Sequence, residues 1–291
     1  DAWTTATARS LICCASAGNH GAGVAFAAWL FGCDCTVFVH RSVTSERRRA
    51  IEQYGAKVIQ TDFDYDGTVR HAEEVAGKNG WIVVADTAYD GYIDIPGKIM
   101  SGYTVIAAEC LDQLAAGSRP THVFLQCGVG SFAAALAAQF WKSLGEKRPK
   151  IITVESDRAS SLVASLKAGK LTTSGLGAES AMLGLAADEL SITAWEILKQ
   201  ATDFALSISD DASRDAMRAL AAPSGDDPKL VAGEAGAAGL GALMALRTSP
   251  DMWNALGLGA ESRVLLFGTE GAMDPESYKA VLSGERTTRT Q

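Results

Sequence analysis

Short apolar runs alternate with longer helical segments over the first part of the chain. The apolar runs predict strands at residues 11–14, 35–40, 57–60 and 81–85. The segments between them predict helices at residues 23–30, 45–54 and 66–78. Strands that alternate with helices form parallel sheets with right-handed crossovers. This part of the chain is therefore expected to form one open α/β unit.

The alternation resumes after residues 86–96, a stretch that is rich in Asp, Gly, Tyr and Thr and has no clear periodicity. Further strands are predicted at residues 121–126, 151–155, 203–209 and 263–267. Helices are predicted at residues 98–116, 194–200, 210–221 and 275–282, behind Ser131 and from Gly233. We place the domain boundary at the aperiodic stretch, which gives α/β domains over residues 1–95 and 96–291.

The first strand ends in a small polar turn, Ala15-Ser16-Ala17-Gly18-Asn19-His20-Gly21, which leads into an apolar helix. The first N–H groups of a helix lack internal partners, and the helix dipole favours negative charge there. Ser16, Asn19 and His20 add side-chain donors. The turn therefore predicts a site for a carboxylate or phenolate oxygen. The alternative is an ordinary turn in which Ser16 or Asn19 is the N-cap.

Two later strands also end in glycine turns. Cys127-Gly128-Val129-Gly130-Ser131 has backbone N–H groups that would suit a phosphate, but it lacks the full dinucleotide fingerprint, so a plain strand-to-helix turn is the alternative. Gly268-Thr269-Glu270-Gly271 follows the last strand. Glu155 ends another strand, at the edge where open α/β sheets place their ligands, and is interpreted as a ligand-facing carboxylate. Because open parallel sheets bind ligands at the carboxyl ends of their strands, the three turns are expected to converge on one crevice.

Composition narrows the class of ligand. The chain has 291 residues, of which 47% are hydrophobic and 21% charged, as in a globular protein large enough for two domains. The net charge of −8 argues against a nucleic-acid partner. No apolar run approaches the roughly 20 residues of a membrane span. Small anionic metabolites fit, because a local site can be positive inside a negative protein.

The cysteines argue against a metal site and a disulfide framework. Zinc sites usually need paired CxxC-type spacings with matching histidines, and the tight Cys33-Asp34-Cys35 is the only spacing here that comes near that type. We therefore predict no metal and reduced thiols in a cytosolic protein. Residues 1–10 lack the basic and apolar regions of a signal peptide, and the polar tail at residues 285–291 is expected to fray. The six cysteines are Cys13, Cys14, Cys33, Cys35, Cys110 and Cys127.

Together, the turns at residues 16–21, 127–131 and 268–271 resemble those of the pyridoxal-phosphate enzymes with the tryptophan synthase β-subunit-like fold, fold type II. Within that fold the sequence is most similar to the diaminopropionate ammonia-lyases. The resemblance covers nearly the whole chain and implies two open parallel-sheet domains, pyridoxal 5'-phosphate as cofactor, a small amino-acid substrate and a cytoplasmic homodimer. It extends through residues 61–68, 86–92, 120–130, 195–198 and 233–241.

The resemblance also implies roles for individual residues. Asn19 would hydrogen-bond the cofactor's ring oxygen, Thr269 would face the pyridine nitrogen and Glu234 would lie near the ring. Residues 1–95 would be the small domain with the asparagine loop, and residues 96–291 the large domain with the phosphate loop. The residues that would hold the substrate carboxylate are Ser16, Ala17, Gly18, Asn19 and His20. The backbone N–H groups that would bind the phosphate belong to Gly128, Val129, Gly130 and Ser131.

Asp86 matches the family's acid–base residue for the L-isomer of the substrate. Its carboxylate would take the α-proton, after which the β-amino group leaves as ammonia. The resemblance thus implies conversion of 2,3-diaminopropionate to pyruvate and ammonia. Without the resemblance, Asp86 would be interpreted as a turn-forming residue.

Ala17 departs from the family, which has an Asp there that serves the D-isomer. We therefore expect the L-isomer to be favoured. The Ser-Ala-Gly-Asn-His form of the turn also resembles threonine and serine dehydratases, so a hydroxyl leaving group is an alternative to ammonia.

The family's Schiff-base lysine lies upstream of the first turn, in a stretch that has no counterpart in the sequence from Asp1. Our hypothesis is that N-terminal elements carrying this lysine are missing, since a parallel sheet without its first elements would expose apolar edges. The alternative of another class is a lysine-less pseudoenzyme with a binding or regulatory role.

Overall fold

The computed structural model describes residues 11–115, 117–177 and 179–284. The expectations for residues 1–10, for the helix end at residue 116 and for the tail at residues 285–291 lie outside the described residues. The chain forms two compact units. The small unit contains the described residues 11–85 together with Met273–Ser277, and the large unit contains residues 86–272 and 278–284. The small unit thus ends at Ala85 rather than near residue 95.

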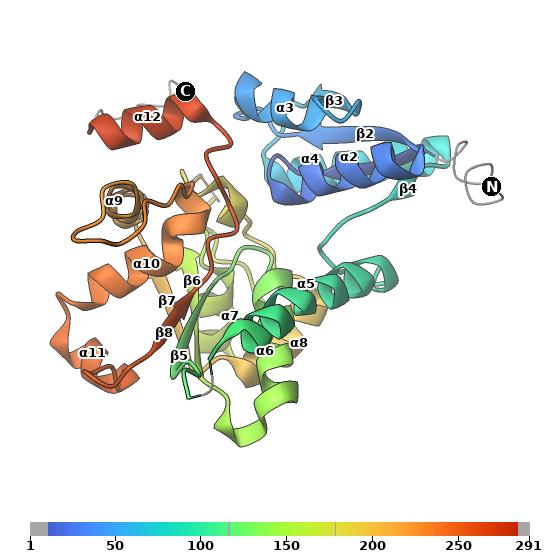
Figure 1. The fold of residues 1–291 in the computed structure, drawn as a ribbon. Coiled ribbons are helices and arrows are strands. Elements are labelled where there is room, and N and C mark those ends of the chain that lie inside the picture. Colours follow the sequence, from blue (N-terminus) through green and yellow to red (C-terminus); the bar gives the residue numbers. More distant parts are fainter. Residues whose placement is uncertain (1–10, 116, 178, 285–291) are drawn as a thin grey trace. The chain divides into compact units, whose positions relative to one another are not determined.

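The small unit is built on a four-stranded parallel sheet in the order β3-β2-β1-β4 (Figure 1). Strands β1 and β2 pair from Leu11 opposite Asp34 to Ala15 opposite Phe38. Its strands are β1 (Leu11–Ala15), β2 (Asp34–Val39), β3 (Lys57–Gln60) and β4 (Ile82–Val83), and its helices are α2 (Asn19–Phe31), α3 (Ser45–Glu52) and α4 (Tyr65–Asn79). The strand–helix alternation predicted from the sequence is confirmed.

Helices cover both faces of this sheet. Residues of α2 and α3 pack with Cys14 and Val37 on one face, and α4 packs with Cys13 and Phe38 on the other. Helix α2 carries no Asp, Glu, Lys or Arg, and its second half exposes large apolar residues to solvent. These exposed residues are Phe26, Trp29, Leu30 and Phe31.

The large unit has a second parallel sheet in the order β7-β6-β5-β8 (Figure 1). Its strands are β5 (His122–Gln126), β6 (Lys150–Ser156), β7 (Phe204–Ile208) and β8 (Val264–Leu266). Its α-helices are α5 (Asp94–Gln113), α6 (Ser131–Leu144), α7 (Ser161–Ala168), α8 (Ile192–Ala201), α9 (Asp210–Ala221), α10 (Glu234–Leu246) and α11 (Pro250–Leu256), and it has 3-10 helices η1 (Gly145–Lys147) and η2 (Leu183–Leu185). Helix α12 (Pro275–Ser283) follows β8, and its residues are divided between the two units.

Strand β5 is buried on both faces. Val123 and Leu125 pack with residues of α5, α6 and α8 on one face, whereas Phe124 packs with residues of α10 on the other. All five residues of the strand are buried, as expected for a central strand of a parallel sheet that helices cover on both sides. The carboxyl end of β5 is therefore a rigid platform.

Helices α7 and α11 were not expected from the sequence. Both are short, and such segments give too few helical periods to be distinguished from a loop. Their end signals are present, because α11 has Pro250 at its first position and ends at Gly257, whose φ of 74° is left-handed. Helix α5 begins at Asp94 rather than at Lys98.

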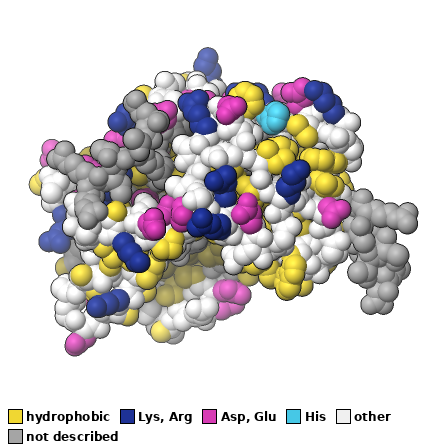
Figure 2. Space-filling view, turned by 90° about the horizontal axis from the view of Figure 1, so that it is seen from above, with side chains coloured by type: hydrophobic (Ala, Val, Ile, Leu, Met, Phe, Trp, Pro, Cys, Tyr) yellow, Lys and Arg dark blue, Asp and Glu magenta, His cyan; other side chains and the backbone are white. Residues whose placement is uncertain are grey.

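None of the helices in the described part of the chain combines the length and apolar character that crossing a bilayer requires. Figure 2 shows Lys and Arg side chains lying among Asp and Glu side chains on one face of the molecule. This mixing agrees with the composition, in which acidic residues exceed basic residues by only eight charges.

Glu155 is a buried carboxylate that holds the start of α7. Its two oxygens accept hydrogen bonds of 2.8 Å from the backbone N–H groups of Leu162 and Val163. The interpretation of Glu155 as a ligand-facing group is therefore wrong, because its oxygens cap a helix. Burial raises the pKa of Glu155 to about 7, although the two backbone donors lower it, and the charge of Asp188 adds a smaller increase.

We expect Glu155 to make the protein less stable as the pH rises. The folded protein keeps this carboxyl protonated up to about pH 7, whereas the unfolded chain releases the proton near 4.5. Because the folded state binds more protons in that window, the free energy of unfolding falls from about pH 4.5 to about pH 7 and is constant above it for this group. Urea unfolding of the Glu155→Gln variant measures the loss of this slope.

The exposed Glu196 supplies the control, because its side chain keeps 63% of its accessible surface. The Glu196→Gln variant should follow the pH dependence of the wild type. Wild-type and Glu155→Gln curves that stay parallel from pH 4.5 to 7 would contradict the assignment to Glu155.

Candidate active site

The phosphate loop connects β5 to α6. Gly130 is the N-cap residue of α6 with a φ of 92°, which favours glycine, and a Cβ there would lie 3.1 Å from the Cβ of Ala194. No side chain caps α6, and its first turn holds no acidic residue. The helix start is thus a cradle of backbone N–H groups with positive potential, as a phosphate requires.

Neighbouring segments hold this loop from behind. The backbone N–H of Ser191 donates to the carbonyl of Val129 at 2.9 Å, and that of Cys127 donates to Val154 at 2.8 Å. A Cβ at Gly128 would lie 2.9 Å from the carbonyl oxygen of Gly184. Only glycine fits between the loop and this backbone, so the loop is fixed before any ligand binds.

Asp86 is tied to the same loop. The hydroxyl of Ser131 donates to the carbonyl of Asp86 at 2.5 Å. Two residues further on, the backbone N–H of Ala88 donates to the hydroxyl of Ser191 at 3.0 Å, and the N–H of Ile192 donates to the carbonyl of Ala88 at 3.0 Å. These contacts place Asp86 within the large unit, next to the start of α6.

The charge of Asp86 affects the pKa of Tyr103 in α5. Burial raises the pKa of the Tyr103 phenol to about 12, with a smaller contribution from the Asp86 carboxylate. The phenol therefore stays protonated at neutral pH and is a hydrogen-bond donor close to Asp86. The sequence did not single out Tyr103, because nothing in the periodicity of α5 separates it from a core aromatic residue.

Thr269 lies at the carboxyl end of β8, in the turn Gly268-Thr269-Glu270-Gly271. The side-chain amide of Gln126, the last residue of β5, donates to the hydroxyl of Thr269 at 3.0 Å and to the carbonyl of Phe267 at 2.9 Å. The hydroxyl of Thr269 is therefore held beside the residue that precedes the phosphate loop.

Glu270 links this turn to α10. Its carboxylate accepts hydrogen bonds from the backbone N–H groups of Ala235 at 2.8 Å and Gly236 at 3.3 Å. Its carbonyl accepts from Gly233 at 2.9 Å. Glu234, the first residue of α10, is buried beside this junction. The structure thus connects Glu234 and Thr269 through Glu270, a capping contact that sequence reasoning missed.

The small unit contains the asparagine turn. Helix α2 begins at Asn19, and its N-cap residue is Gly18, with no side chain capping the helix. The alternative that Ser16 or Asn19 is the N-cap is therefore wrong. As in the large unit, the first turn has no acidic residue, which leaves the helix start suited to an anion.

The polar side chains of the asparagine turn differ in whether they have a hydrogen-bond donor available for a ligand. The Nε2 atom of His20 is 2.8 Å from the carbonyl of Val84, so this nitrogen carries the proton and the ring is committed to the sheet. The hydroxyl of Ser16 accepts from the backbone N–H of Gly18 at 3.3 Å and keeps its own hydrogen to donate. Ala17 is buried, with 7% of its surface exposed. A Cβ at Gly21 would lie 2.3 Å from the Ser16 carbonyl oxygen.

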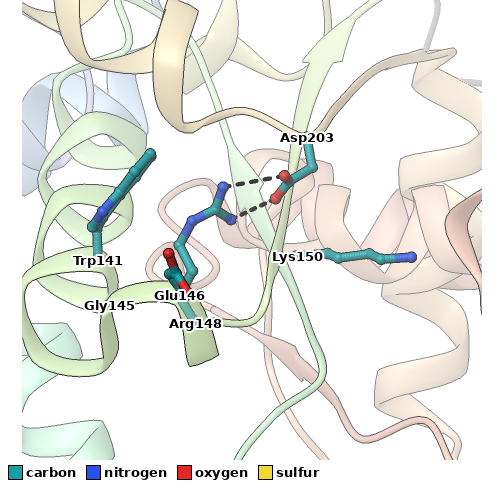
Figure 3. A pocket seen from close by; sticks show the side chains of 6 residues that line it. All are labelled: Trp141, Gly145, Glu146, Arg148, Lys150 and Asp203. Carbon is teal, nitrogen blue, oxygen red and sulfur yellow. Dashed lines mark hydrogen bonds and ion pairs between the residues drawn. The ribbon is translucent and has the colours of Figure 1, made fainter.

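A pocket of about 380 Å³ lies at the amino ends of the strands of the large sheet, where β6 and β7 begin (Figure 3). Arg148 makes two hydrogen bonds to Asp203, of 2.6 and 3.1 Å, and lies 4.7 Å from the ring centre of Trp141. Lys150 donates to the carbonyl of Leu256 at 2.6 Å. Arg148 and Asp203 pair with each other, and Lys150 bonds a backbone carbonyl. Because open parallel sheets bind ligands at the carboxyl ends of their strands, this pocket is not the candidate site.

We next consider metal ligands and lysines that could bond a cofactor covalently among the described residues. Within residues 11–115, 117–177 and 179–284, no group of three or more His, Cys, Asp or Glu side chains is arranged to hold a metal ion. Lys78, Lys98 and Lys199 form surface ion pairs with Glu or Asp on their own helices. Such lysines are not candidates for a covalent bond to a cofactor.

The large unit fits pyridoxal phosphate in two respects. The start of α6 is an uncapped cradle that glycine alone can form, and Thr269 presents a hydroxyl beside it through Gln126. Gln126 itself is buried, and its amide oxygen has no hydrogen-bond partner among the described residues. The start of α6 therefore suits an anionic group such as the phosphate, and the Thr269 hydroxyl suits a polar ring atom of the same ligand.

Comparisons with known proteins agree with this geometry. A family model described as "Pyridoxal-phosphate dependent enzyme" matches residues 3–266. The diaminopropionate ammonia-lyase of Escherichia coli (strain K12) is 37% identical over 269 residues, which are 91% of this chain and 68% of that protein. A catabolic L-threonine dehydratase of Staphylococcus aureus (strain USA300) is 36% identical over 103 residues, which are 35% of this chain and 28% of that protein.

A solved structure extends the similarity to the fold. The crystal structure of Escherichia coli diaminopropionate ammonia lyase in complex with the aminoacrylate-PLP azomethine reaction intermediate superposes with a TM-score of 0.90 at 35% identity. The match covers 97% of this chain and 73% of that chain. The expected fold type II is thus confirmed, with pyridoxal phosphate as the cofactor of the family. The chain belongs to the pyridoxal-phosphate dependent enzymes and, within them, to the diaminopropionate ammonia-lyase family.

Proposed function

We propose that the protein eliminates ammonia from 2,3-diaminopropionate, with pyruvate and ammonia as the products after hydrolysis, and that it favours the L-isomer. The observation that carries this proposal is the hydrogen bond from the Ser131 hydroxyl to the Asp86 carbonyl. It ties a candidate base to the loop that would hold the cofactor's phosphate. Membership of the ammonia-lyase family supports the leaving group.

The cofactor would be held mainly by the large unit. Gly128, Val129, Gly130 and Ser131 would donate backbone N–H groups to its phosphate, Thr269 would face its pyridine nitrogen and Glu234 would lie near its ring. When bound to an amino acid, pyridoxal phosphate withdraws electrons from the α-carbon and makes the α-proton acidic. The rigid loop and the buried turn leave little to reorganise when the ligand binds, which favours catalysis.

Asp86 would take the α-proton of the L-isomer. Its backbone is fixed through Ser131, and the Tyr103 phenol, whose pKa the Asp86 charge raises slightly, stays protonated at neutral pH. Ser191 restrains the same segment through Ala88. These contacts restrain the backbone that carries Asp86, which favours the defined position that general base catalysis requires.

The small unit would hold the substrate. Ser16, Ala17, Gly18, Asn19 and His20 would bind the substrate carboxylate through the start of α2, and Asn19 would also reach the cofactor's ring oxygen. For His20 this role falls to its backbone, since its Nε2 is committed to Val84. The small unit and the large unit would thus act as the two catalytic domains, with Asp86 in the large one. We further propose that the protein works in the cytoplasm as a homodimer, without nucleic-acid or membrane partners.

The substrate panel is the first test. The full chain, loaded with pyridoxal phosphate, should release pyruvate from L-2,3-diaminopropionate at least about tenfold faster than from the D-isomer or L-serine, because each factor of ten needs only 1.4 kcal/mol of selectivity. Threonine dehydration is followed through 2-oxobutyrate. Faster turnover of serine or threonine than of diaminopropionate would replace this proposal with a dehydratase.

Asp86→Asn tests the base. The amide cannot accept the α-proton, so kcat for the L-isomer should fall by about 100-fold or more while cofactor binding, followed by absorbance, is retained. The exposed neighbour Asp90, changed to Asn, is the matched control and should keep the wild-type rate. An Asp86→Asn enzyme that retains the wild-type kcat would remove this role.

Ala17→Asp tests the stereochemical preference. A carboxylate at this position should raise turnover of D-2,3-diaminopropionate, because it adds a base where the asparagine turn meets the substrate. Ala17→Asn is the control, since it has the same size without a basic oxygen. Circular dichroism checks the fold of both variants, because Ala17 is buried. Equal wild-type rates on the two isomers would refute the preference at once.

A further inference from the structure

Gln126 is a buried amide at the carboxyl end of β5, with 5% of its surface exposed. Side chains alternate along a strand, so Gln126 lies on the same face as Phe124, the face that α10 covers. Its amide nitrogen donates to the carbonyl of Phe267 at 2.9 Å and to the hydroxyl of Thr269 at 3.0 Å. Both partners belong to the segment that leaves β8.

The contact with Phe267 fixes which way the amide points. A carbonyl oxygen only accepts hydrogen bonds, so the amide atom beside it must be the nitrogen. That nitrogen carries two hydrogens, and the second is directed at the hydroxyl oxygen of Thr269. Thr269 is therefore the acceptor in its contact with Gln126, and its single hydroxyl hydrogen must point elsewhere.

The amide oxygen of Gln126 lowers the stability of the fold. This oxygen is buried and has no hydrogen-bond partner among the described residues. A buried polar atom without a partner destabilises a fold by about 1–3 kcal/mol, which an apolar side chain of similar size would avoid. The amide nitrogen and its direction, rather than stability, account for a glutamine at this position.

We propose that Gln126 is a positioning residue that makes Thr269 a hydrogen-bond donor toward the cofactor's pyridine nitrogen. This inference rests on the proposed function, which places Thr269 at that nitrogen. A nitrogen that receives a hydrogen bond keeps its lone pair and is not protonated. Gln126 thus controls the protonation state of the cofactor's pyridine nitrogen through Thr269, without contacting the cofactor itself. Hydrogen bonds beyond the direct contacts tune cofactors in the same way.

The 15N chemical shift of the pyridine nitrogen tests this inference. It is measured by NMR on the full chain loaded with 15N-labelled pyridoxal phosphate. The wild type should show an unprotonated nitrogen across neutral pH. In Gln126→Glu, at a pH where the glutamate is ionised, its carboxylate can only accept from Thr269. The Thr269 hydroxyl then turns toward the glutamate and presents its oxygen to the pyridine nitrogen as an acceptor, so the shift should move toward that of a protonated pyridine.

Gln126→Met covers the case in which the glutamate variant does not fold. Methionine keeps the length of the side chain but has no donor, so the Thr269 hydroxyl loses its fixed direction. The nitrogen should then begin to titrate near neutral pH, and cofactor affinity should fall about fivefold, the effect of losing one neutral hydrogen bond. A folded Gln126→Glu or Gln126→Met protein with the wild-type shift at every pH would overturn the inference.

Thr269→Val separates this inference from the proposed function. Valine has no hydroxyl, so adding a Gln126 substitution to Thr269→Val should change the shift no further. If Thr269→Val alone leaves the shift unchanged, Thr269 does not contact the nitrogen and the inference fails whatever the turnover. If the shifts behave as expected but no ammonia is released from diaminopropionate, the proposed function fails and the assignment of Gln126 stands.

Discussion

The burial of strand β5 on both faces is the constraint on which the candidate site depends. Helices α5, α6 and α8 pack on one side of the strand and α10 on the other, so β5 has no freedom to shift. The carboxyl end of β5 sets the positions of the phosphate loop and of Thr269, which are expected to contact the cofactor. The phosphate loop follows it directly, and Gln126 reaches from it to Thr269.

Side-chain hydrogen bonds that the sequence did not predict hold the site together. Ser131 and Ser191 fix the Asp86 segment to the phosphate loop, and Glu270 fixes the Gly-Thr-Glu-Gly turn to the start of α10. Each uses its side chain to satisfy backbone groups that regular structure leaves without partners. The site is therefore preorganised by hydrogen bonds between segments that belong to different helices and strands.

The sequence was sufficient to predict the parallel sheets, most of the helices and the three glycine turns, because these depend on local periodicity and on residues with special backbone conformations. It was not sufficient for Gln126, Ser191 or Glu270, since each bonds to a residue far away in the chain. The misinterpretation of Glu155 has the same origin. A carboxylate that ends a strand gives no sign of whether it faces a ligand or the start of the next helix.

The small unit is assembled from two separate stretches of chain, because Met273–Ser277 joins residues 11–85. Every strand of the large sheet precedes this second stretch. During synthesis on the ribosome, the large sheet therefore has all of its strands before the small unit has all of its residues. The small unit, which begins earlier along the chain, therefore receives its last segment only after the large sheet has all of its strands.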